Sequence, residues 1–131
     1  MDTKLEMLKQ VPLFEGSSRD ELREIATLAD EIDVPADTTL VREGANPYEF
    51  IVILDGEVAV DEGGVPVATL GRGDFLGEIA VLTRGKRTAT AITTAPSRLL
   101  VLTDRAFRQL TDTMPAVAAR AWAATAARMP A

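Results

Sequence analysis

The sequence predicts a mainly β domain, of the sandwich or barrel class, with helices before and after the strands. Short apolar or alternating runs recur at even spacing between residues 31 and 102, and turn signals separate them. Helical periodicity with capping signals precedes and follows these runs. The 131 residues are enough to build one hydrophobic core, so we expect a single domain over residues 1–131.

Two helices are expected before the strands. The first covers residues 3–10 and ends before Pro12, which cannot continue it. The second begins at a capping box, in which Ser18 is followed three residues later by Glu21. This helix covers residues 19–29 and is amphipathic, because its apolar residues recur at helical spacing: Leu22, Ile25, Ala26 and Ala29.

Strand-like runs follow, with turn residues between them. The runs cover residues 31–34, 39–42, 48–54, 57–61, 65–70, 88–93 and 98–102. Asp55-Gly56 is the strongest hairpin signal in the chain. Gly63-Gly64 marks a second tight turn, and the Gly-Arg-Gly-Asp sequence of residues 71–74 marks a third.

Further helices are expected after the strands. Asp104 can cap a helix over residues 105–111. Pro115 suits the first turn of a final helix over residues 116–129, which is rich in alanine. The larger apolar groups of this final helix are Val117, Ala121 and Trp122.

Composition excludes several classes of function. The chain has no cysteine and no histidine, which removes disulfides, thiol catalysis, histidine-based metal sites and Ser-His triads. We therefore expect no enzyme activity and no metal. The net charge of −6 disfavours a nucleic-acid polymer or an acidic membrane as a partner. The N-terminus lacks a signal-peptide layout and no apolar run approaches the ~20 residues of a membrane span, so we expect a cytoplasmic location without a membrane.

Residues 77–91 carry the strongest functional signal. They read Gly-Glu-Ile-Ala-Val-Leu-Thr-Arg-Gly-Lys-Arg-Thr-Ala-Thr-Ala. A glycine at the start of a helical turn leaves backbone N–H groups that suit a phosphate. Arg87 can donate two parallel hydrogen bonds to phosphate oxygens, and Glu78 can accept hydrogen bonds from sugar hydroxyls. This combination describes a small pocket for a cyclic nucleotide.

The same stretch resembles the phosphate-binding cassette of the cyclic nucleotide-binding domain family. The positions that match the family pattern are Gly77, Glu78, Ile79, Ala80, Arg87, Thr88 and Ala89. The resemblance runs from about Leu13 to the C-terminal helix and so covers most of the chain. It departs at Leu76, where aromatic residues are also common, and at Lys86, where many members carry proline.

The resemblance implies a fold with definite boundaries. The expected fold is an eight-stranded β-roll, of the double-stranded β-helix or jelly-roll type, with N-terminal and C-terminal helices. The N-terminal helices would occupy residues 1–30 and the β-roll residues 31–102, with the phosphate-binding cassette at 77–91. The C-terminal helices would occupy residues 104–129.

The resemblance also implies a role for each cassette residue. Arg87 would bind the exocyclic phosphate, and Glu78 would bind the 2′-hydroxyl of the ribose. Gly77 would let the sugar phosphate approach the backbone, because it has no side chain. Ile79 and Ala80 would act through their backbone N–H groups.

The expected ligand is cAMP, with cGMP as the alternative. Thr88 carries a hydroxyl that can reach a phosphate oxygen, and relatives that prefer cGMP often carry threonine at this position. Trp122 is either a core residue or a lid that stacks on the base. Arg120 and Thr125 are alternative contacts of the base.

The resemblance further implies that ligand binding is relayed by a rearrangement of the final helix. A homodimer through this alanine-rich helix is a further expectation, and the effector domain or partner is not identified. Two other interpretations stay open: an interaction module that has lost ligand binding, and a sensor for another small anion. Calorimetry with cAMP and cGMP distinguishes the interaction module from a cyclic-nucleotide sensor. Competition with phosphate and 5′-AMP distinguishes the sensor for another small anion.

Overall fold

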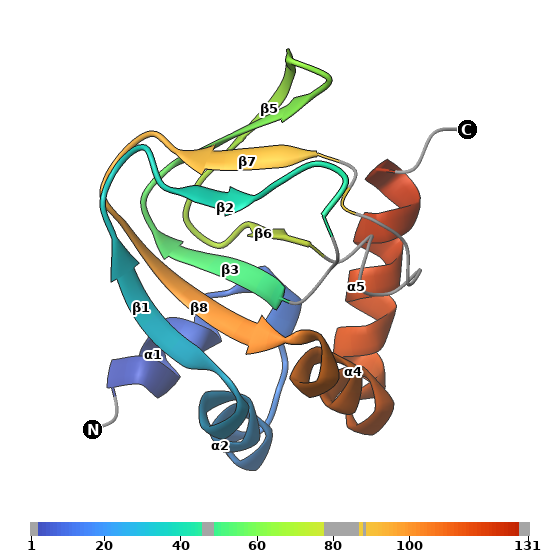
Figure 1. Ribbon diagram of the computed structural model, residues 1–131. Helices are drawn as coiled ribbons and strands as arrows, with labels where there is room; N and C mark the ends of the chain where they lie inside the picture. The colour runs from blue at the N-terminus through green and yellow to red at the C-terminus, as the bar shows by residue number, and fades with distance from the viewer. Residues whose placement is uncertain (1–2, 46–48, 78–86, 88, 129–131) are drawn as a thin grey trace.

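The structure is a computed structural model, and it describes residues 3–45, 49–77, 87 and 89–128 (Figure 1). Helices lie at both ends of the chain and strands lie between them. The helical elements are α1 (Thr3–Lys9), η1 (Pro12–Phe14, a 3₁₀ helix), α2 (Arg19–Leu28), α4 (Asp104–Thr113) and α5 (Pro115–Arg128). The strands are β1 (Asp30–Val34), β2 (Thr39–Val41), β3 (Glu49–Asp55), β4 (Val58–Glu62), β5 (Val65–Leu70), β6 (Phe75–Leu76), β7 (Thr90–Thr93) and β8 (Ser97–Thr103).

The strands form two four-stranded antiparallel sheets. One has the order β1-β8-β3-β6 and the other the order β2-β7-β4-β5. Figure 1 shows α1 and α2 beside the first sheet and α4 and α5 at one end of it. This arrangement confirms the predicted mainly β fold with eight strands and flanking helices. Strand β6 was not among the runs expected from the sequence, because two residues are too short to show a period.

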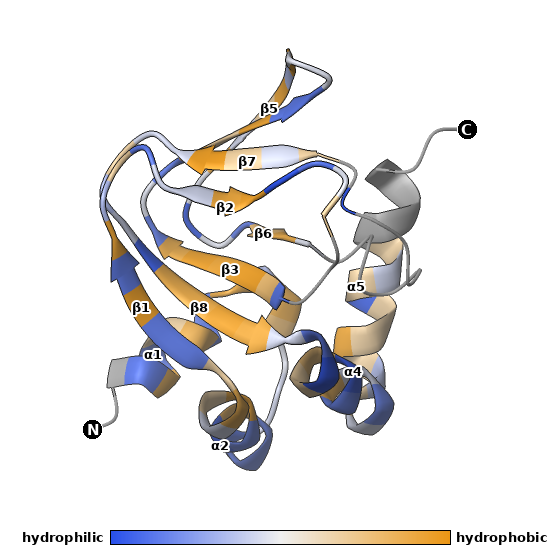
Figure 2. Ribbon diagram, in the orientation of Figure 1, coloured by the Kyte–Doolittle hydropathy of each residue, from blue (hydrophilic) through white to orange (hydrophobic). Residues whose placement is uncertain are grey.

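Strand β3 is buried on both faces. Phe50, Val52 and Leu54 belong to a large cluster shared with the helices, whereas Ile51 and Ile53 belong to a smaller cluster between the two sheets. The alternation follows from the two-residue period of a strand. Both β3 and the neighbouring β8 are mostly hydrophobic in Figure 2, as expected for strands covered on both sides.

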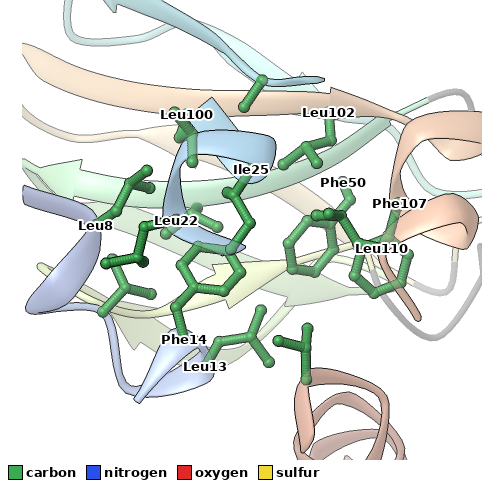
Figure 3. Packing of buried hydrophobic residues seen from close by; sticks show 14 of the residues in the cluster. Leu8, Leu13, Phe14, Leu22, Ile25, Phe50, Leu100, Leu102, Phe107 and Leu110 are labelled. Carbon is green, nitrogen blue, oxygen red and sulfur yellow. The ribbon is translucent and has the colours of Figure 1, made fainter. Parts of the chain in front are cut away.

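The larger core joins the helices to the first sheet. In Figure 3, η1 contributes Leu13 and Phe14, which lie near Ile25 of α2. Phe50 of β3 stacks on Phe107 of α4, with ring centroids 4.0 Å apart. The C-terminal helices therefore rest on the same core as the N-terminal ones. None of the helices that the structure describes is long and apolar enough to span a membrane.

The N-terminus of α2 confirms the predicted capping box. Ser18 Oγ accepts a hydrogen bond from the Glu21 amide at 3.1 Å, and Glu21 Oε1 accepts one from the Ser18 amide at 2.8 Å. At the other end of this helix, Lys4 Nζ donates to the carbonyls of Ala26 and Ala29, each at 2.8 Å. Lys4 thus caps carbonyls that the helix itself leaves without a partner.

Two local predictions were wrong. Asp55-Gly56 does not join a hairpin, because β3 and β4 belong to different sheets and the turn carries the chain from one to the other. The two-residue hairpin lies instead at Gly63-Gly64, between β4 and β5, where both residues have positive φ. Asp104 is not the cap of α4: Thr103 Oγ1 accepts from the Ala106 amide at 3.1 Å, because β8 runs directly into the helix.

Candidate functional site

The structure brings together two of the predicted site residues, Gly77 and Arg87. Gly77 directly follows β6, and Arg87 lies a few residues before β7. Ala89 lies in the bend that leads into β7. The remaining cassette residues lie outside the described part of the chain: Glu78, Ile79, Ala80 and Thr88. The predicted role of Glu78, whose carboxylate would bind the sugar while Arg87 binds the phosphate, therefore stays a prediction.

The main chain of Arg87 is held by the loop that follows β2. Its amide donates to the Ala45 carbonyl at 2.9 Å, and its carbonyl accepts from the Gly44 amide, also at 2.9 Å. One residue earlier in the same loop, the Glu43 amide donates to Thr90 Oγ1 at 3.0 Å. These bonds extend the contact between β2 and β7 past the ends of both strands and fix where the Arg87 side chain begins.

The side chain of Arg87 is buried, with 7% of the residue exposed. Its Nη1 donates to the Gly77 carbonyl at 3.1 Å, and its Nη2 donates to the carbonyl of Glu49, the first residue of β3. A buried charge is costly unless it is hydrogen-bonded, and these carbonyls offset part of that cost. A guanidinium has five N–H groups, so it can hold two carbonyls and a further acceptor at the same time.

Gly77 fits this corner because it has no side chain. Its φ of +96° disfavours any residue with a Cβ, and an added Cβ would lie 2.6 Å from Arg87 Nη1 and 2.8 Å from the Glu49 carbonyl oxygen. The glycine is therefore needed for the approach of the guanidinium to β3. The predicted approach of a sugar phosphate to the same glycine stays a prediction.

The sequence did not point to Ala45 or Glu49 as parts of this site. Both act through main-chain carbonyls, so their side-chain types carry no signal. The nearby Glu43-Gly44 pair was visible only as a turn. We call the group formed by Gly44, Ala45, Glu49, Gly77 and Arg87 the arginine corner.

The structure decides one of the two interpretations of Trp122. This side chain is 49% exposed on α5, so its interpretation as a core residue was wrong. Val117 and Ala121 of the same helix are buried in the larger core. Arg120, an alternative contact of the base, donates from Nη1 to the Leu13 carbonyl at 3.2 Å and so ties α5 to η1. The side chain of Thr125 lies outside the described residues.

No cation site accompanies the arginine corner within the described ranges. No group of three or more histidine, cysteine, aspartate or glutamate side chains among the residues in place converges as metal ligands do.

Comparison with known proteins assigns a family. The model of the cyclic nucleotide-binding domain matches residues 31–114. The chain is similar to the Pycsar effector protein PaPycTIR of Pseudomonas aeruginosa, with 33% identity over 113 residues that cover 86% of this chain and 36% of that protein. It is also similar to a cAMP-dependent protein kinase regulatory subunit of Aspergillus fumigatus, with 32% identity over 105 residues that cover 79% of this chain and 25% of that protein.

A solved structure agrees with this assignment. The Catabolite Activator Protein of Thermus thermophilus matches with a TM-score of 0.77 and 26% identity, over 89% of this chain and 57% of that chain. The match supports the expected β-roll with its flanking helices. The chain spans about a third or less of the two curated relatives, whose aligned shares are 36% and 25%. Since the family model matches the strands and α4 together, the chain belongs to the cyclic nucleotide-binding domain family.

Proposed function

We propose that this domain binds a cyclic nucleotide at the arginine corner and acts as a sensor, with cAMP as the preferred ligand. The observation that carries the proposal is the buried guanidinium of Arg87, held from both sides by main-chain groups. Such a group is positioned before the ligand arrives, so binding costs little ordering of its side chain. The phosphate would bind to Arg87 and the ribose 2′-hydroxyl to Glu78.

The preference for cAMP rests on likeness. The Aspergillus relative is named as a regulatory subunit of a cAMP-dependent kinase, and the Thermus structure is a catabolite activator. Thr88 keeps cGMP as the alternative. A carboxylate that receives the ribose hydroxyl would reject a 2′-deoxy nucleotide, because the carboxylate would lose a hydrogen-bond donor.

The signal would leave through α5. This helix packs on α4 and η1, and Arg120 joins it to the Leu13 carbonyl. A ligand can shift the position of such a helix only by binding one arrangement better than the other. Trp122 is exposed on α5 and could cover the base in the bound arrangement. A homodimer through α5 and an effector outside this domain complete the proposal.

Calorimetric titration with cAMP and cGMP tests the proposal. We expect saturable heat for one site per chain with a cyclic nucleotide, and weaker heat with its 2′-deoxy form. Inorganic phosphate and 5′-AMP serve as competitors. No heat and no thermal shift at millimolar cyclic nucleotide would favour an interaction module, and full competition by phosphate or 5′-AMP would favour a sensor for another small anion.

Fluorescence tests the relay. Trp122 is the single tryptophan in the chain, so its emission reports on α5 alone. We expect cAMP to change the emission with the same midpoint as the calorimetric titration, because a base that stacks on the indole removes it from water. Heat without any change in emission would contradict the role of Trp122 as a lid.

A further inference from the structure

A contact between two distant loops lies next to the arginine corner. The hairpin between β4 and β5 turns at Gly63-Gly64, and the Gly63 amide donates to Glu43 Oε1 at 2.8 Å. Glu43 belongs to the loop that follows β2, in the same sheet but not beside this hairpin in strand order. Its carboxylate thus joins the tip of the hairpin to the loop at the β2 edge of the same sheet.

The residues that follow Glu43 are those that hold Arg87. The Gly44 amide and the Ala45 carbonyl make the two main-chain hydrogen bonds with Arg87, and the Glu43 amide bonds to Thr90 at the start of β7. Thr90 in turn pairs with Asp61 near the end of β4. The loop is therefore fixed on one side by β7 and on the other by the hairpin tip.

We propose that Glu43 is a positioning residue for Arg87: its bond to the hairpin tip holds the loop of residues 43–45, which sets the main chain of Arg87. This inference rests on the proposed function, in which Arg87 binds the ligand phosphate. Glu43 needs no contact with the ligand. Its role is to keep the Gly44 amide and the Ala45 carbonyl in place.

The geometry favours a role for the hydrogen bond over a role for the charge alone. A carboxylate near an anionic ligand lowers its affinity through repulsion, whereas the bond to Gly63 raises affinity by fixing the loop. The two effects have opposite signs. Glu43→Gln keeps an oxygen acceptor and removes the charge, while Glu43→Ala removes both.

The first test compares the cAMP affinity of these variants by calorimetry. Glu43→Ala is expected to weaken binding roughly three- to tenfold, the range for loss of one ordinary hydrogen bond, because this bond is exposed to solvent. Glu43→Gln is expected to stay within about twofold of the wild-type affinity, because the amide oxygen replaces the acceptor. Glu62→Ala is the matched control, since it removes a carboxylate from the same hairpin and keeps the bond between Glu43 and Gly63. If Glu43→Ala binds as tightly as wild type, or Glu43→Gln as weakly as Glu43→Ala, the proposal is overturned.

The second test needs no ligand and so separates this inference from the proposed function. Amide hydrogen exchange is measured in the ligand-free protein for Arg87 and Gly44. Ile53 is the reference, because this residue is buried and its amide donates to the Asp74 carbonyl. Glu43→Ala should speed exchange at Arg87 and Gly44 several-fold while Ile53 is unchanged. Equal acceleration of exchange at all three amides would show that Glu43 only stabilises the fold. No acceleration would show that its bond to Gly63 does not hold the loop. Either result would overturn the proposal. If the wild type does not bind cAMP, the proposed function is wrong, but the exchange result still shows whether Glu43 holds the main chain of Arg87.

Discussion

Two arginines of the β-roll bind their partners in opposite ways. Arg87 is buried, and its guanidinium donates to the main-chain carbonyls of Gly77 and Glu49. Arg98 of β8 is exposed, and it forms an ion pair with Asp33 on the neighbouring edge strand β1. Arg98 Nε donates to Asp33 Oδ1 at 2.9 Å and Nη2 donates to Oδ2 at 3.4 Å.

The contrast shows that the fold holds the side chain of Arg87 in place and leaves Arg98 to pair at the surface. Water and salt screen the exposed ion pair, so we expect it to contribute little to the free energy of unfolding despite its good geometry. The hydrogen bond from Arg98 lowers the pKa of the Asp33 carboxyl below its ordinary value of 3.8, and the same bond raises the pKa of Arg98. At Arg87 the partners are fixed carbonyls at the ends of β3 and β6, so the side chain is positioned by the fold.

The largest expected effect is the loss of ligand affinity in Arg87→Ala. Truncation of one partner in a buried charged contact costs about 2–5 kcal/mol, which corresponds to roughly 30-fold to several thousand-fold in Kd. Glu78→Ala should weaken binding as well. Calorimetry with cAMP measures these changes. Arg98→Ala, which removes the exposed guanidinium, should bind like wild type. Equal cAMP affinity of the Arg87→Ala and Arg98→Ala variants would show that burial of Arg87 gives it no special role in binding.

Gly77→Ala should follow in size. The new methyl group would meet the guanidinium of Arg87 and the carbonyl of Glu49 and would also strain a backbone with φ of +96°. Gly64→Ala is the control for strain alone, because Gly64 has φ of +82° and open space around its Cβ position.

We expect Gly64→Ala to lower the free energy of unfolding by about 1–2 kcal/mol, the usual cost of a left-handed residue. Its cAMP affinity should fall no further than that of Glu43→Ala, because Gly64 adjoins the Gly63 amide that Glu43 holds. Gly77→Ala should lose more stability and at least about tenfold in affinity, because the clash displaces Arg87. Denaturant unfolding and calorimetry measure the two quantities. Equal stability and equal cAMP affinity of the two alanine variants would show that the close contact between Gly77 and Arg87 does not affect binding.

A third cation sharpens the comparison, because Lys4 is also held by carbonyls but lies away from the site. Lys4→Met keeps the apolar stem and removes the bonds to Ala26 and Ala29. We expect a loss of about 1–3 kcal/mol in the free energy of unfolding, typical of hydrogen bonds to a charged group, and no change in cAMP affinity. A change in affinity as large as that of Arg87→Ala would mean that stability alone governs binding.

The smallest effect is expected for Asp33→Asn. Since folding lowers the pKa of Asp33, the stability it contributes is present above the ordinary value of 3.8 and is lost as the pH falls through the folded value. Thermal unfolding at pH 6 should show the variant slightly below wild type, and the difference should shrink as the pH falls below 3.8. A difference that grows on acidification would contradict the direction of the pKa shift.

Sequence reasoning succeeded where a side chain acts on its own neighbours. The capping box of Ser18 and Glu21 is of this kind, because both partners lie within one turn. The sequence placed Gly77 and Arg87 in one site, from the residues and from the family resemblance, but it did not predict the hydrogen bond from Arg87 to the Gly77 carbonyl. The Asp55-Gly56 signal predicted a turn correctly but not which strands the turn joins, since that choice depends on the packing of two sheets.

The contacts that were missed involve main-chain atoms or short elements. Glu49 and Ala45 offer carbonyls to Arg87, and any residue type carries a carbonyl. Strand β6 has too few residues to display a pattern. The exposure of Trp122 depends on how α5 lies on α4 and η1, and its sequence neighbours do not specify that orientation.

A crystal structure of the domain with cAMP would show whether Arg87 binds the phosphate. We expect the exocyclic phosphate within hydrogen-bond distance of the Arg87 guanidinium and the ribose 2′-hydroxyl on the Glu78 carboxylate. The hydrogen bonds between the main chain of Arg87 and those of Gly44 and Ala45 should be preserved. A nucleotide bound elsewhere, or a phosphate that leaves Arg87 without contact, would contradict it.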